Sequence, residues 1–290
     1  MGNLSGSDRD SGAIYEVRRR RLLLGVGGIT LTGIVGSRLL SAPDHLPPHR
    51  EVSAWQKPAA QKPAARKPAA QRSPVSHHAA AKHPDPRAYH PASYPLNRPL
   101  YYIDDASKAI ALTIDDGPDP VYTPQVLGVL HRYGVTATFS MIGLHVAAYP
   151  HLARSVAEAG HHIANHTWTH SDLTRVPVHR VHTELAWTSH AIHSATGVHP
   201  QLFRAPYGAW SATVIRQCER MRMVPVDWSV DPRDWARPGV RRIVRNIMHN
   251  THPGSIILEH DGGGNRSQTV DALKIVLPRL LREGYHFQTV

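Results

Sequence analysis

The sequence predicts an α/β fold over about residues 98–290, in which crossover helices connect parallel strands. Two observations predict this fold. Short apolar runs rich in Val and Ile are typical of strands, and they alternate with longer segments whose apolar residues recur at the helical period. This alternation places helices against the faces of a parallel sheet, which forms either a barrel or an open sheet.

The predicted elements follow one another in strict alternation along the chain. The predicted strands are residues 109–114, 135–142, 162–164, 202–204, 223–228, 255–258 and 285–290. The predicted helices are residues 123–133, 145–159, 178–195, 210–220, 240–249 and 269–282. If the strands form a barrel, the chemistry is expected on the loops that follow their carboxyl ends.

The positive charge of the chain lies mostly outside this region. The 290 residues carry a net charge of +11, but residues 1–97 hold 14 Lys and Arg against 6 Asp and Glu. Residues 98–290 hold 19 against 16, so the composition argues against a nucleic-acid-binding domain. The single cysteine, Cys218, excludes a disulfide framework and a multi-thiolate metal cluster within one chain.

Residues 1–41 are interpreted as an export signal or a membrane anchor. Four arginines at positions 18–21 precede an apolar, glycine-rich run of 16 residues, 22–37. This run is shorter than a relaxed membrane span of about 20 residues, and its flanks fit an export signal of the twin-arginine kind. A buried helix is the alternative. We expect an extracytoplasmic protein, secreted or tethered to the membrane. The segment has no A-x-A site, which argues against cleavage, so the choice between cleavage and retention as an anchor stays open.

Residues 42–97 are predicted to be a disordered linker rich in Pro, Ala and Lys. The segment contains three copies of a five-residue repeat between residues 57 and 71, Lys-Pro-Ala-Ala followed by Gln or Arg. Proline at every fifth position removes helical hydrogen bonds and favours extended conformations, and such a segment buries too little apolar surface to fold. The linker therefore fits a spacer that holds the domain at residues 98–290 away from a surface.

Two adjacent carboxylates, Asp115 and Asp116, end the first predicted strand before a turn at Gly117 and Pro118. Because neighbouring residues on a strand point in different directions, one carboxylate could bind a metal while the other acts as a base. An Asx-type turn that only caps the loop would use the same residues.

Two histidines, His166 and His170, follow the third predicted strand. On a helical turn, residues four apart face the same side and can share one cation through imidazole nitrogens. The chain holds 22 histidines, so such a pair also arises by chance. Joined to a carboxylate from another strand end, the pair becomes a two-histidine, one-carboxylate metal site with open positions for water, which suits hydrolysis.

Three later motifs place polar side chains after further predicted strands. Arg204 could orient a carboxylate, and the turn after it could present a backbone N–H to a developing oxyanion. Asp231 and Asp234 lie beside Trp235, whose ring could stack on a sugar face. His260 stands where a general acid would be needed. Taken singly, each of these motifs also fits a purely structural role.

The order and spacing of the five motifs resemble the polysaccharide deacetylase family, which is carbohydrate esterase family 4 or the NodB homology domain. The resemblance covers roughly residues 105–290. The family patterns T-F-D-D-G-P, H-[ST]-x-x-H, R-x-P-[YF], D-x-x-D-W and L-x-H are matched at residues 113–118, 166–170, 204–207, 231–235 and 258–260. Ile114 replaces the usual Phe, where we expect a packing role.

The resemblance implies a distorted (β/α) barrel with about seven strands and a metal-dependent hydrolase. It implies Asp116, His166 and His170 as ligands of a divalent metal, with zinc favoured and cobalt or nickel able to substitute. It implies Asp115 as the general base that takes a proton from water. It implies His260 as the general acid that protonates the departing amine.

The resemblance also implies supporting roles around this centre. The backbone N–H of Tyr207 would help to hold the oxyanion. Arg204 and Asp234 would orient Asp115 or His260, and the sequence leaves open which pairs with which. Trp235 and Leu258 would line the substrate-binding groove and the pocket for the acetyl group.

The function expected from this resemblance is hydrolysis of N-acetyl groups from an amino-sugar polymer, with release of acetate. The predicted export segment and basic linker favour peptidoglycan, followed by deacetylation of chitin oligomers and then of acetylated xylan. Two alternatives remain, namely a metal amidohydrolase for a non-sugar amide and a catalytically silent wall-binding module. No protein partner is evident in the sequence.

Overall fold

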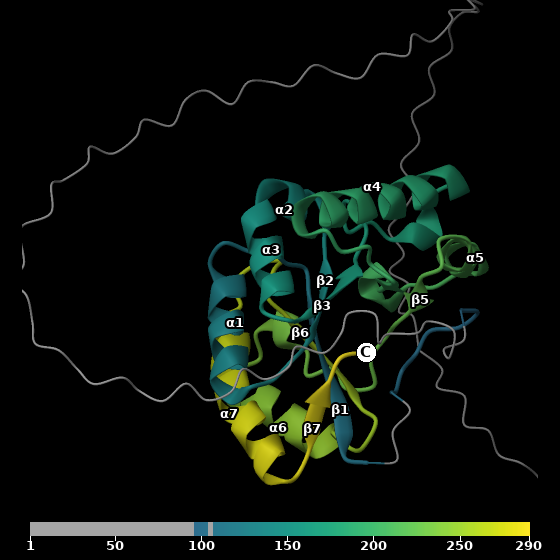
Figure 1. Cartoon of the computed structure of the whole chain (residues 1–290). Helices are drawn as coiled ribbons and strands as arrows, with labels where there is room; N and C mark the ends of the chain where they lie inside the picture. Colours follow the sequence, from purple (N-terminus) through teal and green to yellow (C-terminus); the bar gives the residue numbers. More distant parts are fainter. Residues whose placement is uncertain (1–95, 104–106) are drawn as a thin grey trace, which may run out of the picture. The chain divides into compact units, whose positions relative to one another are not determined.

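The computed structural model describes residues 96–103 and 107–290, which form a curled parallel-sheet half-barrel with flanking helices (Figure 1). The predicted export segment and all but the last two residues of the predicted linker lie outside the described residues. Within the part of the chain that is described, no helix is both long enough and apolar enough to cross a membrane.

Seven strands of the described residues make one sheet, and every pairing between them is parallel. The strands are β1 (Ala109–Asp115), β2 (Thr138–Met141), β3 (His162–Asn165), β4 (Leu202–Phe203), β5 (Val224–Pro225), β6 (Ile256–His260) and β7 (His286–Gln288). Their order is β5-β4-β3-β2-β1-β6, and β7 pairs with the first residues of β1. The β1–β6 register sets Asp115 beside His260.

Between residues 107 and 290, seven α-helices cover the sheet. They are α1 (Tyr122–Tyr133), α2 (Gly143–Ala148), α3 (Pro150–Glu158), α4 (Val178–Thr196), α5 (Ala212–Arg220), α6 (Val240–Asn250) and α7 (Ser267–Arg282). The connections in this part of the chain hold the short 3-10 helices η2 (Leu173–Arg175), η3 (Pro206–Gly208) and η4 (Asp234–Ala236).

The period-2 alternation of β1 positions the site. Ile110, Leu112 and Ile114 point outward into the apolar layer between the sheet and the helices. Ala109 and Ala111 belong to the inner cluster, on the concave side of the sheet. Because side chains on a strand alternate, Thr113 and Asp115 share the inner face with these alanines.

Two sequence predictions about local structure are wrong. The single helix predicted at 145–159 is two helices, because Pro150 has no N–H to donate and disfavours a helical residue before it. The segment from His166 to His170 is not a helical turn but an irregular loop, in which Thr167 and His170 have φ of 68° and 59°.

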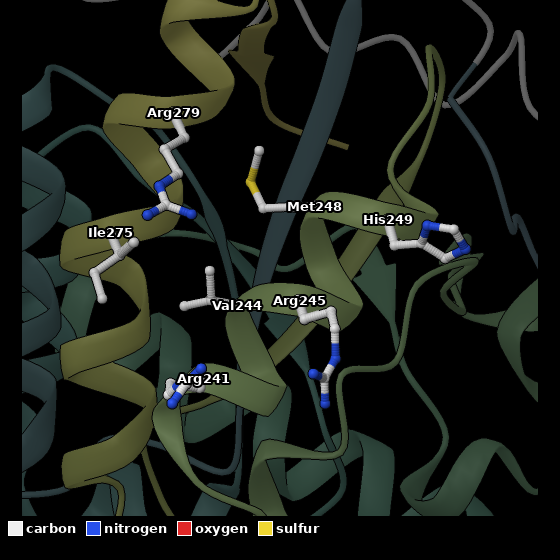
Figure 2. Close-up of a pocket in the computed structure, with 7 residues that line it drawn as sticks. All are labelled: Arg241, Val244, Arg245, Met248, His249, Ile275 and Arg279. Carbon is white, nitrogen blue, oxygen red and sulfur yellow. The ribbon is translucent and has the colours of Figure 1, made fainter.

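A groove of about 550 Å³ lies between α6 and α7 (Figure 2). It is lined by Arg241, Val244, Arg245, Met248, His249, Ile275 and Arg279. No residue of the five sequence motifs is among them. This groove is therefore separate from the cluster of motif residues, whose placement follows.

Candidate active site

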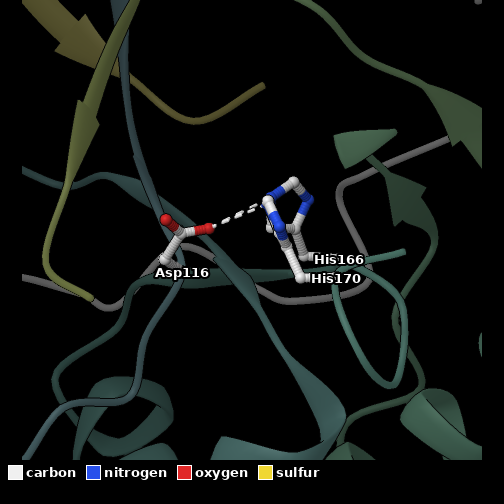
Figure 3. A group of neighbouring side chains, drawn as sticks. All are labelled: Asp116, His166 and His170. Carbon is white, nitrogen blue, oxygen red and sulfur yellow. Dashed lines mark ion pairs between the residues drawn. The ribbon is translucent and has the colours of Figure 1, made fainter. Parts of the chain in front are cut away.

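Three potential metal ligands meet at the carboxyl ends of β1 and β3. Oδ1 of Asp116 lies 3.4 Å from Nε2 of His166 and 3.3 Å from Nε2 of His170 (Figure 3). The three ligand atoms all lie within 4.8 Å of one another. The loop after β3 therefore brings His166 and His170 to one side through an irregular backbone, where a helical turn was predicted.

The donor set fits a divalent cation. Oδ1 of Asp116 is buried and accepts no hydrogen bond within the described residues. Nδ1 of His166 lies 2.9 Å from the backbone oxygen of Arg204, which can only accept, so Nδ1 carries the proton and Nε2 presents its lone pair to the site. Two imidazole nitrogens and one carboxylate oxygen suit zinc and the ions that replace it.

The electrostatics of the three ligands follow from their proximity. Burial opposes ionisation of Asp116, yet the imidazoles of His166, His260 and His170 hold the pKa of this carboxyl well below its usual range. Burial works against the charge on His166, but the carboxylates of Asp115 and Asp116 raise its pKa. Asp116 is thus ionised and able to bind a cation at neutral pH.

The loop that carries the histidines is held by buried polar contacts. Oδ1 of Asn165 accepts the N–H of Thr167 at 2.9 Å. The buried carboxylate of Glu184, on α4, accepts the N–H of Thr169 at 2.8 Å and its hydroxyl at 2.9 Å. These contacts fix a backbone with positive φ at non-glycine residues, a conformation that needs support from its surroundings.

Asp115 pairs with Arg204 on the inner face of the sheet. Nη1 of Arg204 donates to Oδ1 of Asp115 at 2.8 Å and to Oγ1 of Thr113 at 2.6 Å, and Nη2 donates to the backbone oxygen of Asp227 at 2.8 Å. Arg204 is only 1% exposed. The other carboxylate oxygen of Asp115 lies 3.8 Å from Nε2 of His166 and so faces the metal-ligand group.

Asp234 pairs with His260 on the neighbouring strand end. Nδ1 of His260 lies 2.7 Å from Oδ1 of Asp234, and Oδ2 of Asp234 accepts the N–H of His260 and the hydroxyl of Thr269. Burial disfavours the imidazolium, but Asp234, Asp116 and Asp115 together raise the pKa of His260 to about 9. His260 is therefore protonated at neutral pH, as a general acid requires.

Aromatic and apolar residues border these polar groups. Tyr207 is 69% exposed, and its ring contacts that of His170 at 4.7 Å between centroids. Trp235 is 45% exposed and carries the guanidinium of Arg233 over its ring. Leu258 is buried two residues before His260, on the same face of β6. In the described residues the N–H of Tyr207 has no hydrogen-bond acceptor, so it is available to an oxyanion.

Sequence reasoning missed several residues that shape the site. Thr113 could have been found from its position two residues before Asp115, because that spacing puts both on one face of a strand. Asp227, Glu184 and Thr269 lie in no motif, and each enters through contacts distant in sequence. Asp261 donates its N–H to the backbone oxygen of Asp115, and burial raises the pKa of its carboxyl to about 7.

Known proteins resemble this chain, which combines a curled parallel half-barrel with carboxylates and histidines at its strand ends. Residues 103–226 match the family model for polysaccharide deacetylase. A chitooligosaccharide deacetylase of Bradyrhizobium sp. (strain ANU 289) is 44% identical over 191 residues, which are 62% of this chain and 87% of that protein. A peptidoglycan-N-acetylglucosamine deacetylase of Bacillus cereus is 40% identical over 198 residues, covering 68% and 92%.

Solved structures show the same fold. The peptidoglycan N-acetylglucosamine deacetylase Bc1960 matches with a TM-score of 0.64 and 32% identity, over 66% of this chain and 89% of that one. A pseudoenzyme of carbohydrate esterase family 4 from Bacillus anthracis matches with a TM-score of 0.63 and 27% identity, over 67% and 68%. The chain belongs to the polysaccharide deacetylase family and is a hydrolase by that membership. Since the fold also occurs in a pseudoenzyme, activity depends on the side chains present.

Proposed function

We propose that the protein is a metal-dependent deacetylase that hydrolyses the N-acetyl groups of an amino-sugar polymer and releases acetate. The observation that carries this proposal is the completeness of the site. A candidate ligand group of Asp116, His166 and His170 is flanked by a carboxylate held by an arginine and by an imidazole held by a carboxylate. Amide hydrolysis needs a base on one side of the carbonyl and an acid for the leaving nitrogen.

A divalent cation held by Asp116, His166 and His170 would polarise the acetamide carbonyl and lower the pKa of the attacking water. Zinc is the ion we propose, with cobalt or nickel as substitutes. The site fits such an ion because Oδ1 of Asp116 is buried and finds no hydrogen-bond partner among the described residues, and because Nε2 of His166 presents a lone pair.

The residues around the ligands divide the proton transfers between them. Asp115 takes the proton of the water through its Oδ2, because Oδ1 is occupied by Arg204. His260 protonates the leaving amine from Nε2, because its Nδ1 proton is donated to Asp234. The N–H of Tyr207 donates to the oxygen that develops charge. Arg204 and Asp234 thus act as positioning residues, one for the base and one for the acid.

Peptidoglycan is the substrate that we favour, and chitin oligomers are the second candidate. The exposed rings of Tyr207 and Trp235 border the site and suit stacking on sugar faces, as a polymer of either kind requires. The relatives named above are a peptidoglycan-N-acetylglucosamine deacetylase and a chitooligosaccharide deacetylase, so similarity supports both candidates. The basic linker at residues 42–97 favours an anionic wall.

The test is acetate release by the full chain from purified peptidoglycan and from N-acetylated chitin oligomers, with acetylated xylan as a third substrate. Each reaction is run after chelation and again after zinc or cobalt is restored. Release that stops with the chelator and returns with the metal supports the proposal, and the better substrate decides between the candidates. Metal bound at one equivalent without release from any sugar would favour a non-sugar amide, and no bound metal would refute the mechanism.

We also propose that the protein acts outside the cytoplasm, exported or anchored through residues 1–41. Four arginines before a 16-residue apolar run support this location. Fractionation of producing cells, with sequencing of the mature N-terminus, tests it. A protein found only in the cytoplasm with its first residues intact would refute export.

A further inference from the structure

A second acidic side chain lies next to His260 and takes no part in the proposed mechanism. Glu259 precedes His260 on β6 and is 0% exposed. Because strand residues alternate, its side chain points with that of Ile257 toward the layer between the sheet and the helices. Neither of its carboxyl oxygens accepts a hydrogen bond from any donor within the described residues. A buried ionised carboxylate without donors is strongly disfavoured, because it loses its hydration without gaining any compensating hydrogen bond.

The charged groups that face Glu259 explain how it is accommodated. They are Asp234 and Asp231, from the loop around η4, and Arg266, at the start of α7. Arg266 is already committed to three backbone oxygens, because Nε donates to Gly262, Nη1 to Trp235 and Nη2 to Gly263. Arg266 keeps its charge and lowers the pKa of Glu259, but it forms no ion pair with Glu259 among the described residues, and burial with the charges of Asp234 and Asp231 outweighs it. The side-chain partner of Glu259 is the carboxyl of Asp234.

Two carboxylates in contact can be stable when one of them keeps its proton. Asp234 is the ionised member, since both of its oxygens accept hydrogen bonds from His260 and Thr269. Glu259 is then the neutral member. Burial, followed by the charges of Asp234 and Asp231, raises the pKa of Glu259 well above its usual range, which agrees with this assignment.

We propose that Glu259 is a positioning residue for the general acid, a protonated carboxylic acid that donates a hydrogen bond to Asp234 and so fixes the carboxylate that holds His260. The proposal rests on the proposed role of His260 in amine protonation. The proton of Glu259 stays on Glu259 throughout the reaction. The donated hydrogen bond draws negative charge away from Asp234, so His260 holds its own proton less tightly than it would beside an unshared carboxylate.

Paired substitutions of Glu259 in the full chain test the catalytic part of this inference. Glu259→Leu removes the donor, so the charge of Asp234 acts fully on His260. We expect the basic limb of the pH profile of kcat/KM to move upward by about half a unit or more, and kcat to fall roughly 3- to 10-fold because a more tightly held proton is transferred less readily. Glu259→Gln donates without ionising and should restore the native profile. A basic limb that is the same in native protein and Glu259→Leu would overturn the proposal.

A second measurement needs neither substrate nor the leucine variant. Infrared difference spectroscopy at neutral pH detects the carbonyl stretch of a protonated carboxylic acid. We expect this band in the native chain and in Glu219→Gln, an exposed-glutamate control, and we expect Glu259→Gln to lose the share that Glu259 contributes. The buried carboxyl of Asp261, whose pKa is raised to about 7, contributes a separate share that stays in all three proteins. A spectrum in which Glu259→Gln removes no such band would show that Glu259 is ionised and would overturn the proposal. Because the spectrum does not depend on acetate release, failure of the deacetylase assignment would be seen separately.

Discussion

Asp115→Asn separates the proposed base from the metal ligands. Oδ2 of Asp115 faces Nε2 of His166 at 3.8 Å, while Oδ1 accepts from Arg204 at 2.8 Å. Asparagine has the same size and can still accept from Arg204, so the local geometry is kept, but an amide cannot take a proton from water. Removal of a positioned base costs roughly 10²- to 10⁴-fold in rate. We expect acetate release to fall by at least roughly 100-fold with one metal ion still bound.

The same substitution also has a cost in stability that the structure bounds. Arg204 is fully buried, and its bonds to Thr113 and to the backbone of Asp227 survive the change. What is lost is the charge of one hydrogen-bonded partner, which corresponds to about 1.5–3 kcal/mol. Both variants leave the buried guanidinium of Arg204 without a counter-charge, but Asp115→Leu also removes the hydrogen-bond acceptor, so it should cost more, about 3–5 kcal/mol.

The assay combines three measurements on the same preparations of full chain: urea unfolding, metal content after dialysis and acetate release. Arg204→Met added to Asp115→Leu is the matched control, because it removes the orphaned charge and should recover stability without recovering activity. Near-normal turnover by Asp115→Asn would refute the assignment of the base. Loss of metal from Asp115→Asn would instead make Asp115 a ligand.

Three further outcomes are expected. His170→Ala should lose metal and activity together, as measured by metal content and acetate release. His260→Ala should lose activity and keep the metal. If His170→Ala kept its metal, His170 would not be a ligand. The rate should fall as pH rises through about 9, where His260 loses its proton, and a native profile without that limb would contradict the assignment of the acid. Burial lowers the pKa of His161 to about 4, so its contribution to stability is complete above pH 6.5 and is lost as pH falls toward 4, by up to roughly 3 kcal/mol. Urea unfolding at pH 7 and 4.5 should show that His161→Gln removes this share of the pH dependence, and an unchanged difference would count against it.

The fold could be predicted from sequence because its signals are local. The strand β1 alternates large and small apolar residues, and that pattern alone indicates two buried faces. The carboxyl ends of parallel strands share one edge of a sheet, so motifs that follow successive strands could be expected to converge. The confirmed half-barrel is the result of such regularities.

The pairings within the site could not be predicted, because they depend on how far the sheet curls. Arg204 and Asp115 are separated by 89 positions and meet across the inner face of the sheet, which Ala109 and Ala111 also line. Glu184 is one acidic residue on a long amphipathic helix, and nothing in its local pattern marks it as the support of Thr169. The loop from His166 to His170 escaped prediction because its positive φ values are imposed by such distant contacts.

The buried Arg204–Asp115 pair also constrains how such a protein can change over generations. A lineage that no longer needs hydrolysis gains nothing from Asp115, yet it cannot replace that residue alone without stranding the guanidinium of Arg204 in the interior. Loss of the catalytic carboxylate therefore also lowers the stability of the fold, unless Arg204 is replaced as well. Substitutions at the two positions should accumulate as a pair, and a homologue with an apolar residue at one of them should have lost the charge at the other.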